Sequence, residues 1–227
     1  MNPKIKVDLL EYLAEASKKH AKIPSIPELS QELGISVSSV REQLEVARSL
    51  GFVDVKPKVG IQTRAFSLTQ PLELGMRYGI KVQPHLFESY GDLRKHVETS
   101  YWYEAAALLN RPDIASLNQL VKTATQKIHE QPIQVPESEH RAFHLTIFQR
   151  LNNPVVLSIL ETYWELYAQA EVNYYLDQNY LETVWNYHQR IVDALEAREF
   201  EKGFQALTAH MDLFKQRKKA ELQQRFE

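Results

Sequence analysis

Apolar residues in the first quarter of the chain recur every three or four positions in three short stretches, the spacing that gives a helix one buried face. We expect these helices within residues 5–18, 25–34 and 36–51. Their apolar positions are Ile5, Leu9, Tyr12 and Leu13, then Leu29 and Leu33, then Val40, Leu44 and Ala47. Gly34 is placed to end the second helix and Ser36 to cap the third, which predicts a tight corner between them.

Alternation of apolar and polar residues then replaces the helical spacing. It runs through residues 52–56 and again through 61–66, and Pro57 and Gly60 mark a turn between these two strands. Three short helices followed by a two-stranded ribbon predict a winged helix-turn-helix domain over residues 1–68.

Beyond residue 84 the helical spacing returns and almost no strand pattern remains. Helices are expected near residues 85–109, 113–129, 137–151, 154–177, 180–197 and 200–225. Residues 69–84 contain two prolines and two glycines, which favours a linker or a short helix that joins two domains. The predicted fold is therefore mainly α, with a winged helix-turn-helix followed by an all-helical bundle of about six helices over residues 85–227.

Composition excludes several classes of protein. The 227 residues include no cysteine, which excludes disulfides and thiolate metal sites. The first residues lack a continuous apolar core, and no stretch approaches the roughly 20 apolar residues that cross a bilayer. We therefore expect a cytoplasmic protein with no signal peptide and no membrane partner. The net charge is −2, but residues 1–68 carry +2 and the rest −4, a polarity that suits a nucleic-acid-binding N-terminal domain.

The third helix and the ribbon carry side chains that suit a DNA-binding domain. Short polar side chains and a cation in the N-terminal half of a recognition helix fit the major groove and its phosphates. The candidate DNA-binding residues are Ser36, Ser38, Ser39, Arg41, Arg48, Lys56, Lys58, Gly60 and Arg64. Taken singly, some have a plain structural explanation, with Ser36 as an N-cap and Lys56 and Lys58 as a solvated turn.

Four histidines lie on apolar faces of the predicted C-terminal helices. His140 and His144 are four residues apart on one face, and His188 and His210 belong to two later helices. Imidazoles from three helices that converge inside a bundle form a metal site, and imidazole suits zinc, nickel, iron or manganese ions. The alternative is that each is an ordinary buried or surface histidine, which is the better explanation for a lone histidine.

The N-terminal stretch resembles the winged-helix domain of the GntR family of transcriptional regulators. The matching positions are Pro24-Ser25, Leu29, Leu33-Gly34, Ser36, Val40-Arg41-Glu42, Leu44, Gly51 and Gly60. The resemblance implies three arginines directed at DNA, but Pro27 and Val37 stand at two of their positions and only Arg41 is kept. We therefore expect either weaker DNA binding with a smaller salt dependence or an unusual operator.

The segment 85–215 resembles the all-helical ligand-binding domain of the FadR branch of that family, the FCD type, in its shorter, VanR-like form. The resemblance rests on the run His140-Arg141-Ala142-Phe143-His144, on Asn153, on His188, Ile191 and Ala194, and on His210. It implies a divalent metal ion on the four histidines. Because His140 stands where the family has an aspartate, three possibilities are open: His140 binds the ion, Glu137 or Glu139 replaces it, or the site is empty.

The same resemblance implies an arginine in the first helix of that domain, and Arg94 occupies its position. An arginine on an inward face needs an anion. That anion is either Glu98, one turn further on, or the carboxylate of an effector, and the two are compatible. The candidate effector-binding residues are Arg94, Tyr101 and Asn153.

Together these features predict a homodimeric, metabolite-responsive regulator that binds a palindromic operator in double-stranded DNA. Its effector is expected to be a small carboxylate bound by the metal ion and Arg94 inside the helical domain. We do not expect an enzyme, because a hydrolytic metal motif such as His-Glu-x-x-His is absent from the sequence. The alternative is a helical metal-binding protein or an interaction module that has lost DNA binding.

Overall fold

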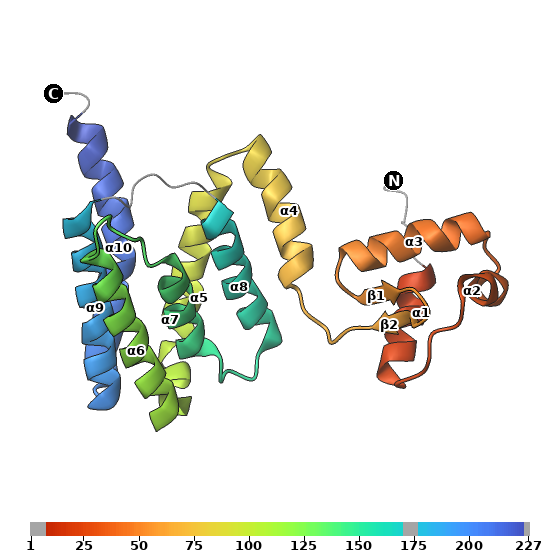
Figure 1. Cartoon of the computed structure of the whole chain (residues 1–227), viewed down its shortest axis with the longest axis horizontal. Helices are drawn as coiled ribbons and strands as arrows, with labels where there is room; N and C mark the ends of the chain where they lie inside the picture. Colours follow the sequence, from red (N-terminus) through yellow and green to blue (C-terminus); the bar gives the residue numbers. More distant parts are fainter. Residues whose placement is uncertain (1–7, 170–176, 225–227) are drawn as a thin grey trace. The chain divides into compact units, whose positions relative to one another are not determined.

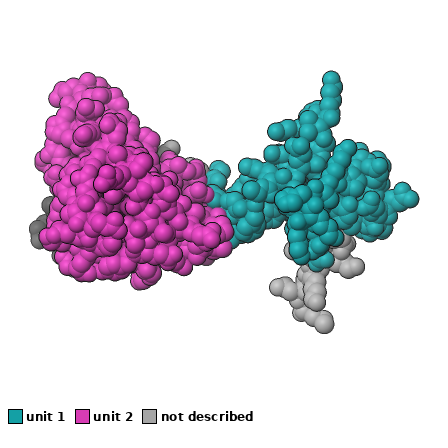
Figure 2. Space-filling model, turned by 90° about the horizontal axis from the view of Figure 1, so that it is seen from below, with its two compact units in different colours: residues 1–78 teal, residues 79–227 magenta. Residues whose placement is uncertain are grey.

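The computed structural model describes residues 8–169 and 177–224. The chain divides into two compact units, residues 1–78 and 79–227, which Figure 2 shows in different colours. The division falls inside a helix, α4 (Thr69–Val82), which occupies the segment expected to be a linker or a joining helix. Near its start, the Gln70 side chain donates a hydrogen bond to the backbone oxygen of Ser49 at 3.0 Å. This bond fastens the beginning of α4 to the N-terminal unit.

The N-terminal unit is a winged helix-turn-helix, as predicted (Figure 1). Its elements are α1 (Asp8–Lys18), α2 (Ile26–Leu33), α3 (Val37–Ser49), β1 (Val53–Lys56) and β2 (Gly60–Thr63). The strands are antiparallel, with Val53 opposite Thr63 and Lys56 opposite Gly60. The core of the unit draws on all three helices and the ribbon, chiefly on Leu9, Leu29, Val40, Ala47 and Val53.

Short-range hydrogen bonds and one glycine fix the corner between α2 and α3. Gly34 ends α2 in a left-handed conformation, with φ at 64°, which residues with a Cβ rarely adopt. Ser30 Oγ donates to the backbone oxygen of Ile35 at 2.6 Å, and Ser36 Oγ accepts from the backbone N–H of Ser39 at 3.1 Å. The N-terminus of α3 is thereby held at the surface, with Ser36 exposed.

The second unit is an all-helical bundle, which confirms the predicted fold class (Figure 1). Its helices are α5 (Leu86–Leu108), α6 (Arg111–Ile128), α7 (Glu137–Phe148), α8 (Pro154–Gln169), α9 (Gln178–Glu196) and α10 (Phe200–Gln224). Helix α5 packs against α7, α8 and α10, and α9 packs against α6 and α10. The helix expected near 154–177 is described as far as Gln169, and residues 170–176 lie outside the described residues.

One acidic side chain joins the start of α6 to the end of α7. Asn110 and Asp113 form a capping box, in which each side chain accepts a hydrogen bond from the backbone N–H of the other, at 3.0 and 2.9 Å. The Asp113 carboxylate also accepts hydrogen bonds from Gln149 and Arg150, which follow α7 directly.

Along the described parts of the chain, none of the helices is long and apolar enough to cross a bilayer.

Candidate functional site

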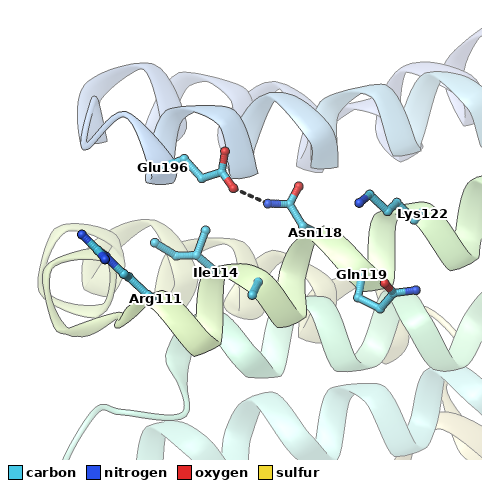
Figure 3. A pocket seen from close by; sticks show the side chains of 7 residues that line it. Arg111, Ile114, Asn118, Gln119, Lys122 and Glu196 are labelled. Atoms are coloured by element: carbon cyan, nitrogen blue, oxygen red, sulfur yellow. Dashed lines mark hydrogen bonds between the residues drawn. The ribbon is translucent and has the colours of Figure 1, made fainter.

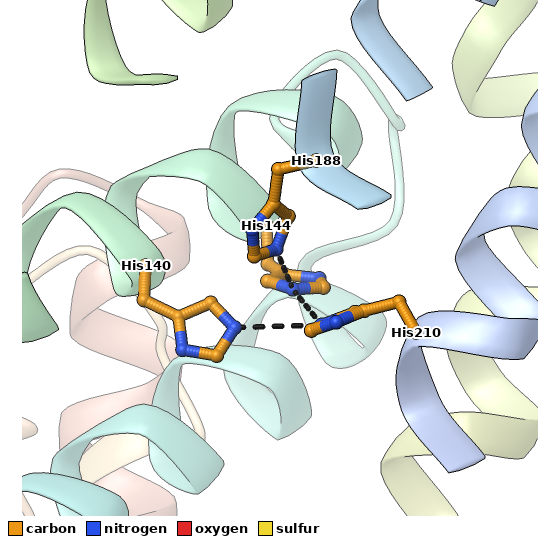
Figure 4. A group of neighbouring side chains, drawn as sticks. All are labelled: His140, His144, His188 and His210. Atoms are coloured by element: carbon orange, nitrogen blue, oxygen red, sulfur yellow. Dashed lines mark hydrogen bonds between the residues drawn. The ribbon is translucent and has the colours of Figure 1, made fainter. Parts of the chain in front are cut away.

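The four predicted histidines meet inside the helical bundle (Figure 4). Helix α7 supplies His140 and His144, α9 supplies His188, and α10 supplies His210. The Nε2 atom of His210 lies 3.4 Å from Nε2 of His140 and 3.2 Å from Nε2 of His144. The Nε2 atom of His188 lies 3.3 Å from that of His144. Because one nitrogen of each ring lies within 4.8 Å of the others, these residues form a single group, called here the histidine cluster.

Aromatic side chains surround the histidine cluster and exclude water from most of it. The Trp164 ring centroid lies 4.7 Å from that of His140, and the Phe143 and Trp185 centroids lie 4.4 and 4.5 Å from that of His188. Three of the four histidines are buried, and His140 is half-buried. Such surroundings strengthen every electrostatic interaction within the cluster.

Burial keeps these histidines neutral. Loss of solvation is the main cause that lowers the pKa of all four imidazoles well below the usual value, and the charge of Arg94 acts in the same direction. At neutral pH each ring therefore keeps a lone pair on one nitrogen. This is the form in which imidazole binds a metal ion.

A buried carboxylate from α5 stands behind His144. Glu98 Oε2 lies 2.8 Å from Nδ1 of His144, and Glu98 Oε1 accepts a hydrogen bond from Nε of Arg94 at 2.6 Å. Burial raises the pKa of Glu98, and the neighbouring Arg94 charge opposes this rise. In the tautomer that carries its proton on Nδ1, His144 donates to an ionised Glu98 and has a lone pair on Nε2, which lies 3.2 Å from Nη2 of Arg94 and faces the cluster.

The guanidinium of Arg94 is also held by aromatic faces. Its central carbon lies 4.6 Å from the ring centroid of Tyr163 and 4.5 Å from that of Trp164, and its side chain is buried. Cations over aromatic faces are attracted by the ring quadrupole. Glu98, one of the two anions that the sequence leaves open for Arg94, is its ion-pair partner in this structure.

The donor set of the histidine cluster fits a divalent metal ion. Two nitrogens bound to one zinc ion at about 2.0–2.1 Å lie roughly 3.3 Å apart when the angle between them is tetrahedral. The three closest pairs of Nε2 atoms lie 3.2–3.4 Å apart. The acidic substitutes considered from the sequence lie elsewhere, since the Glu139 carboxylate accepts hydrogen bonds from Lys127 at 2.8 and 2.9 Å and Glu137 is exposed.

Tyr101 and Asn153, the other candidate effector contacts, are joined by a hydrogen bond, and Asn153 also forms a hydrogen bond with the backbone of α8. Asn153 Nδ2 donates to the Tyr101 hydroxyl at 3.3 Å, and Asn153 Oδ1 accepts from the backbone N–H of Val156 at 3.2 Å. Asn153 thus caps the start of α8. Both side chains are half-buried, and the contacts described for them do not reach the histidine cluster.

The candidate DNA-binding residues fall on α3 and on the ribbon. Exposed positions among them are Ser36, Ser38, Arg41, Arg48, Lys56, Lys58, Gly60 and Arg64, whereas Ser39 is half-buried. Arg48 is engaged by Glu45, with its Nε 2.9 Å from Oε2. Within the described residues, Arg41 has no ion-pair partner. The turn of the ribbon places Lys58 in a left-handed conformation, with φ at 64°.

Sequence reasoning missed two residues of the site. The sequence indicates Glu98 as a partner of Arg94 but not of His144, and it indicates Trp164 only as one of several aromatic side chains that line a pocket or belong to the core or the dimer interface, not as a neighbour of the histidines. The spacing of four residues between Arg94 and Glu98 indicates a pair on one helix face. Nothing in the spacing reveals that α5 and α8 bring Glu98 and Trp164 to the histidines, because that depends on how the helices pack.

An open groove runs along the outside of the bundle between α6 and α9 (Figure 3). Arg111, Asn118, Gln119 and Lys122 of α6 line it together with Glu196 of α9. Asn118 Nδ2 donates a hydrogen bond to the Glu196 carboxylate across it. None of the residues singled out from the sequence lines this groove, so the chemistry of the site is concentrated at the histidine cluster.

Comparison with known proteins supports both the fold and the likeness to regulators. The profile of the FCD domain family matches residues 90–213, more than half of the chain. The Uxu operon regulator of Haemophilus influenzae is 23% identical over 196 residues, which cover 84% of this chain and 71% of that protein.

Two solved structures share the fold. Streptococcus agalactiae GntR superposes with a TM-score of 0.64 at 18% identity, covering 92% of this chain and 97% of that one. The Listeria monocytogenes regulator Lar, described as controlling expression of the agr system, gives a TM-score of 0.50 at 14% identity, covering 94% and 96% of the two chains. At these identities the structures establish a common architecture.

Proposed function

This chain belongs to the GntR family of transcriptional regulators, in its FCD-type (FadR) branch, and from that premise we propose that it binds operator DNA in response to a small organic acid. The observation that carries the proposal is the histidine cluster, in which three pairs of Nε2 atoms lie 3.2–3.4 Å apart beside a buried arginine. A buried set of neutral donors next to a cation suits a metal ion and an anionic ligand.

The proposed metal ligands are His140, His144, His188 and His210, which hold a zinc, nickel, iron or manganese ion. When bound, a divalent ion supplies a positive charge that attracts a carboxylate. Four imidazoles leave that charge uncompensated, and the ion pair of Arg94 with Glu98 adds no net charge. Replacing the aspartate of the family by His140 therefore favours a more strongly anionic effector.

Arg94 is the proposed carboxylate contact of the effector. Its guanidinium has donors beyond the Nε–H that bonds to Glu98, and a planar carboxylate accepts from such a fork through two parallel hydrogen bonds. The proposal for Tyr101 and Asn153 as further effector contacts rests on the sequence, because their hydrogen bonds in this structure have structural roles.

DNA recognition is assigned to the N-terminal half of α3 and to the ribbon. The exposed Ser36, Ser38 and Arg41 at the start of α3 suit phosphates and base edges. Two copies of the chain related by a two-fold axis match the two halves of a palindromic operator. The effector acts through its different affinities for the DNA-competent arrangement and the alternative one.

DNA binding is tested by fluorescence anisotropy on labelled duplexes from the region upstream of the protein's own gene, at low and moderate salt. We expect saturable binding that weakens as salt is raised, because phosphate contacts release counterions. If the metal-loaded protein binds none of these duplexes at any salt concentration, the DNA-binding half of the proposal is contradicted. That result would favour the alternative, an interaction module that has lost DNA binding.

Metal binding is tested by elemental analysis of protein purified without chelators or metal-affinity columns. We expect close to one divalent ion per chain in the wild type and its loss in His188→Ala. The matched control is His85→Ala, which removes an exposed histidine outside the cluster and should leave the metal content unchanged. Equal metal content in the wild type and both variants contradicts the metal-binding half.

A further inference from the structure

The buried polar side-chain atoms that lack a hydrogen-bond partner gather at one place. In the described residues these atoms are Trp164 Nε1, His188 Nδ1 and His210 Nδ1. Two belong to the histidine cluster itself, and Trp164 packs against it. Buried polar groups in native proteins are almost always bonded to protein or to an ordered molecule. Three unpaired atoms in the cluster and in a ring packed against it therefore indicate that a bound molecule completes this part of the core.

A metal ion bound by the Nε2 atoms of the cluster accounts neither for the unpaired Nδ1 atoms of His188 and His210 nor for the indole of Trp164. The Trp164 ring lies 4.7 Å from the His140 centroid and 5.2 Å from the His144 centroid, and the Arg94 guanidinium lies over it at 4.5 Å. Trp164 is 1% exposed. The Trp164 ring therefore packs against both the proposed metal ligands and the proposed carboxylate contact.

Another tryptophan of the bundle provides an internal comparison. Trp102 is equally buried, and its Nε1–H donates to the backbone oxygen of Phe200 at 2.8 Å. A buried indole in this fold thus finds an acceptor where the packing offers one. The missing acceptor at Trp164 is a local feature of the site and not a general property of the bundle.

The chemistry of the missing partner follows from that of the indole. The indole N–H is a donor and has no acceptor function, so its partner must present a lone pair. A divalent ion held by neutral imidazoles beside the Arg94–Glu98 pair would make an oxygen atom of an anion the favoured partner. A ligand whose carboxylate reaches Arg94 or the metal ion needs a second oxygen group to reach Trp164 as well.

We propose that Trp164 is a specificity-determining residue, whose indole N–H donates to a second oxygen group of the effector. It selects hydroxy acids and dicarboxylic acids over simple monocarboxylic acids of the same length. This inference rests on the proposed function, since it concerns the acid bound at the same site. Leaving a buried donor unpaired is costly, which is why a ligand without the second oxygen is disfavoured.

The first test follows the indole N–H signals of the ¹⁵N-labelled, zinc-loaded protein by NMR during titration with propionate, lactate and malonate. The chain has three tryptophans, so three indole signals can be assigned. We expect lactate and malonate to move the Trp164 signal and leave the Trp102 signal in place. An acid that binds in an Arg94-dependent manner without moving the Trp164 signal overturns the inference while the proposed function stands.

The second test compares Trp164→Phe with the wild type by calorimetry, using the same three acids. Phenylalanine keeps an aromatic face for Arg94 and lacks the N–H. We expect the affinity for lactate and malonate to fall by about tenfold, and that for propionate to change by less than about twofold. An unchanged ratio of lactate to propionate affinity overturns the inference.

Two further results are informative. If Trp164→Phe does not fold, the NMR titration of the wild-type protein alone tests the role of Trp164. Its indole signals are then assigned by through-bond NMR and not by substitution. If none of the three acids binds the zinc-loaded wild type at millimolar concentration, acid sensing by this site is contradicted and the role of Trp164 falls with it.

Discussion

Glu98 contacts both Arg94 and His144, so its carboxylate couples the proposed effector contact to a proposed metal ligand. The arrangement resembles the carboxylate–histidine pairs that orient metal-binding imidazoles in other proteins, where the carboxylate fixes the tautomer and raises ligand basicity. The charge of Arg94 in turn opposes the rise in the pKa of Glu98 that burial causes. Three residues from two helices therefore depend on one another.

Replacing Glu98 by Gln should weaken zinc binding by about 10- to 100-fold, because the neutral amide holds the Nδ1 proton of His144 less strongly. Competition with a chromogenic zinc chelator measures the affinity. Glu139→Gln is the matched control, because Glu139 is also a buried carboxylate but bonds to Lys127 outside the cluster. Similar zinc affinities in the two variants would show that Glu98 does not orient His144.

At this scale the sequence predicted the histidines but not their neighbours. Each histidine was recognised because it shares a helix face with apolar residues, as His188 does with Ile191 and Leu195. Helical spacing is a local property and can be read from one segment. The contact between Glu98 and His144 joins residues 46 positions apart and depends on the packing of α5 against α7.

Helix ends in the bundle are stabilised by charged side chains as well as by backbone caps, and Asp113 shows this at the start of α6. The hydrogen bonds from Arg150 are the main cause that lowers the pKa of Asp113, and the backbone N–H of Asn110 contributes. A carboxyl group with a lowered pKa in the folded state stabilises the fold above its unfolded pKa. That contribution is lost as the pH falls through the folded value.

Asp113→Asn should therefore lower the free energy of unfolding at neutral pH by up to about 1 kcal/mol, because the neutral amide loses the ion pair with Arg150. The deficit should shrink as the pH falls from the unfolded pKa of about 3.9 through the lower folded value, because Asp113 of the folded wild type then becomes protonated as well. Urea unfolding of the wild type and the variant at neutral and acidic pH measures this difference in the free energy of unfolding. A deficit of the same size at every pH would contradict a role for the Asp113 charge.

Helix α3 carries two exposed arginines that differ in their surroundings. Arg48 bonds to Glu45, whereas Arg41 has no ion-pair partner in the described part of the chain. Arg41→Ala should weaken operator binding by about fivefold and lower the magnitude of the salt slope by about one. Arg48→Ala should have a smaller effect, since Glu45 already offsets its charge. Anisotropy titrations over a range of salt concentrations compare them, and equal slopes for both variants would refute the assignment.

The boundaries of the elements were predicted best where a cap or a proline marks them. Gly34 and Ser36 end and begin helices where the sequence indicated, and α8 begins at Pro154. The end of α7 was expected near residue 151 but lies at Phe148. No glycine or proline stands between Phe148 and Leu151 to mark that end, whereas Asn110 and Pro112 mark the start of α6 clearly.

The whole molecule combines two units with different chemistry. The N-terminal unit presents exposed polar and cationic side chains on α3 and the ribbon, and the helical unit holds four histidines together in one cluster. A regulator needs both, because an effector that binds one unit changes DNA affinity only if it favours one arrangement of the protein. Such coupling is reciprocal, so operator DNA must alter effector affinity by the same factor.

X-ray absorption spectroscopy of the zinc-loaded protein at neutral pH tests the central claim most directly, because it reports the atoms around the ion. The account predicts a first shell of nitrogen and oxygen near about 2.0–2.1 Å, with the multiple-scattering signature of several imidazoles. A shell made of oxygen without imidazole scattering, or a protein that does not retain zinc during gel filtration, would contradict it.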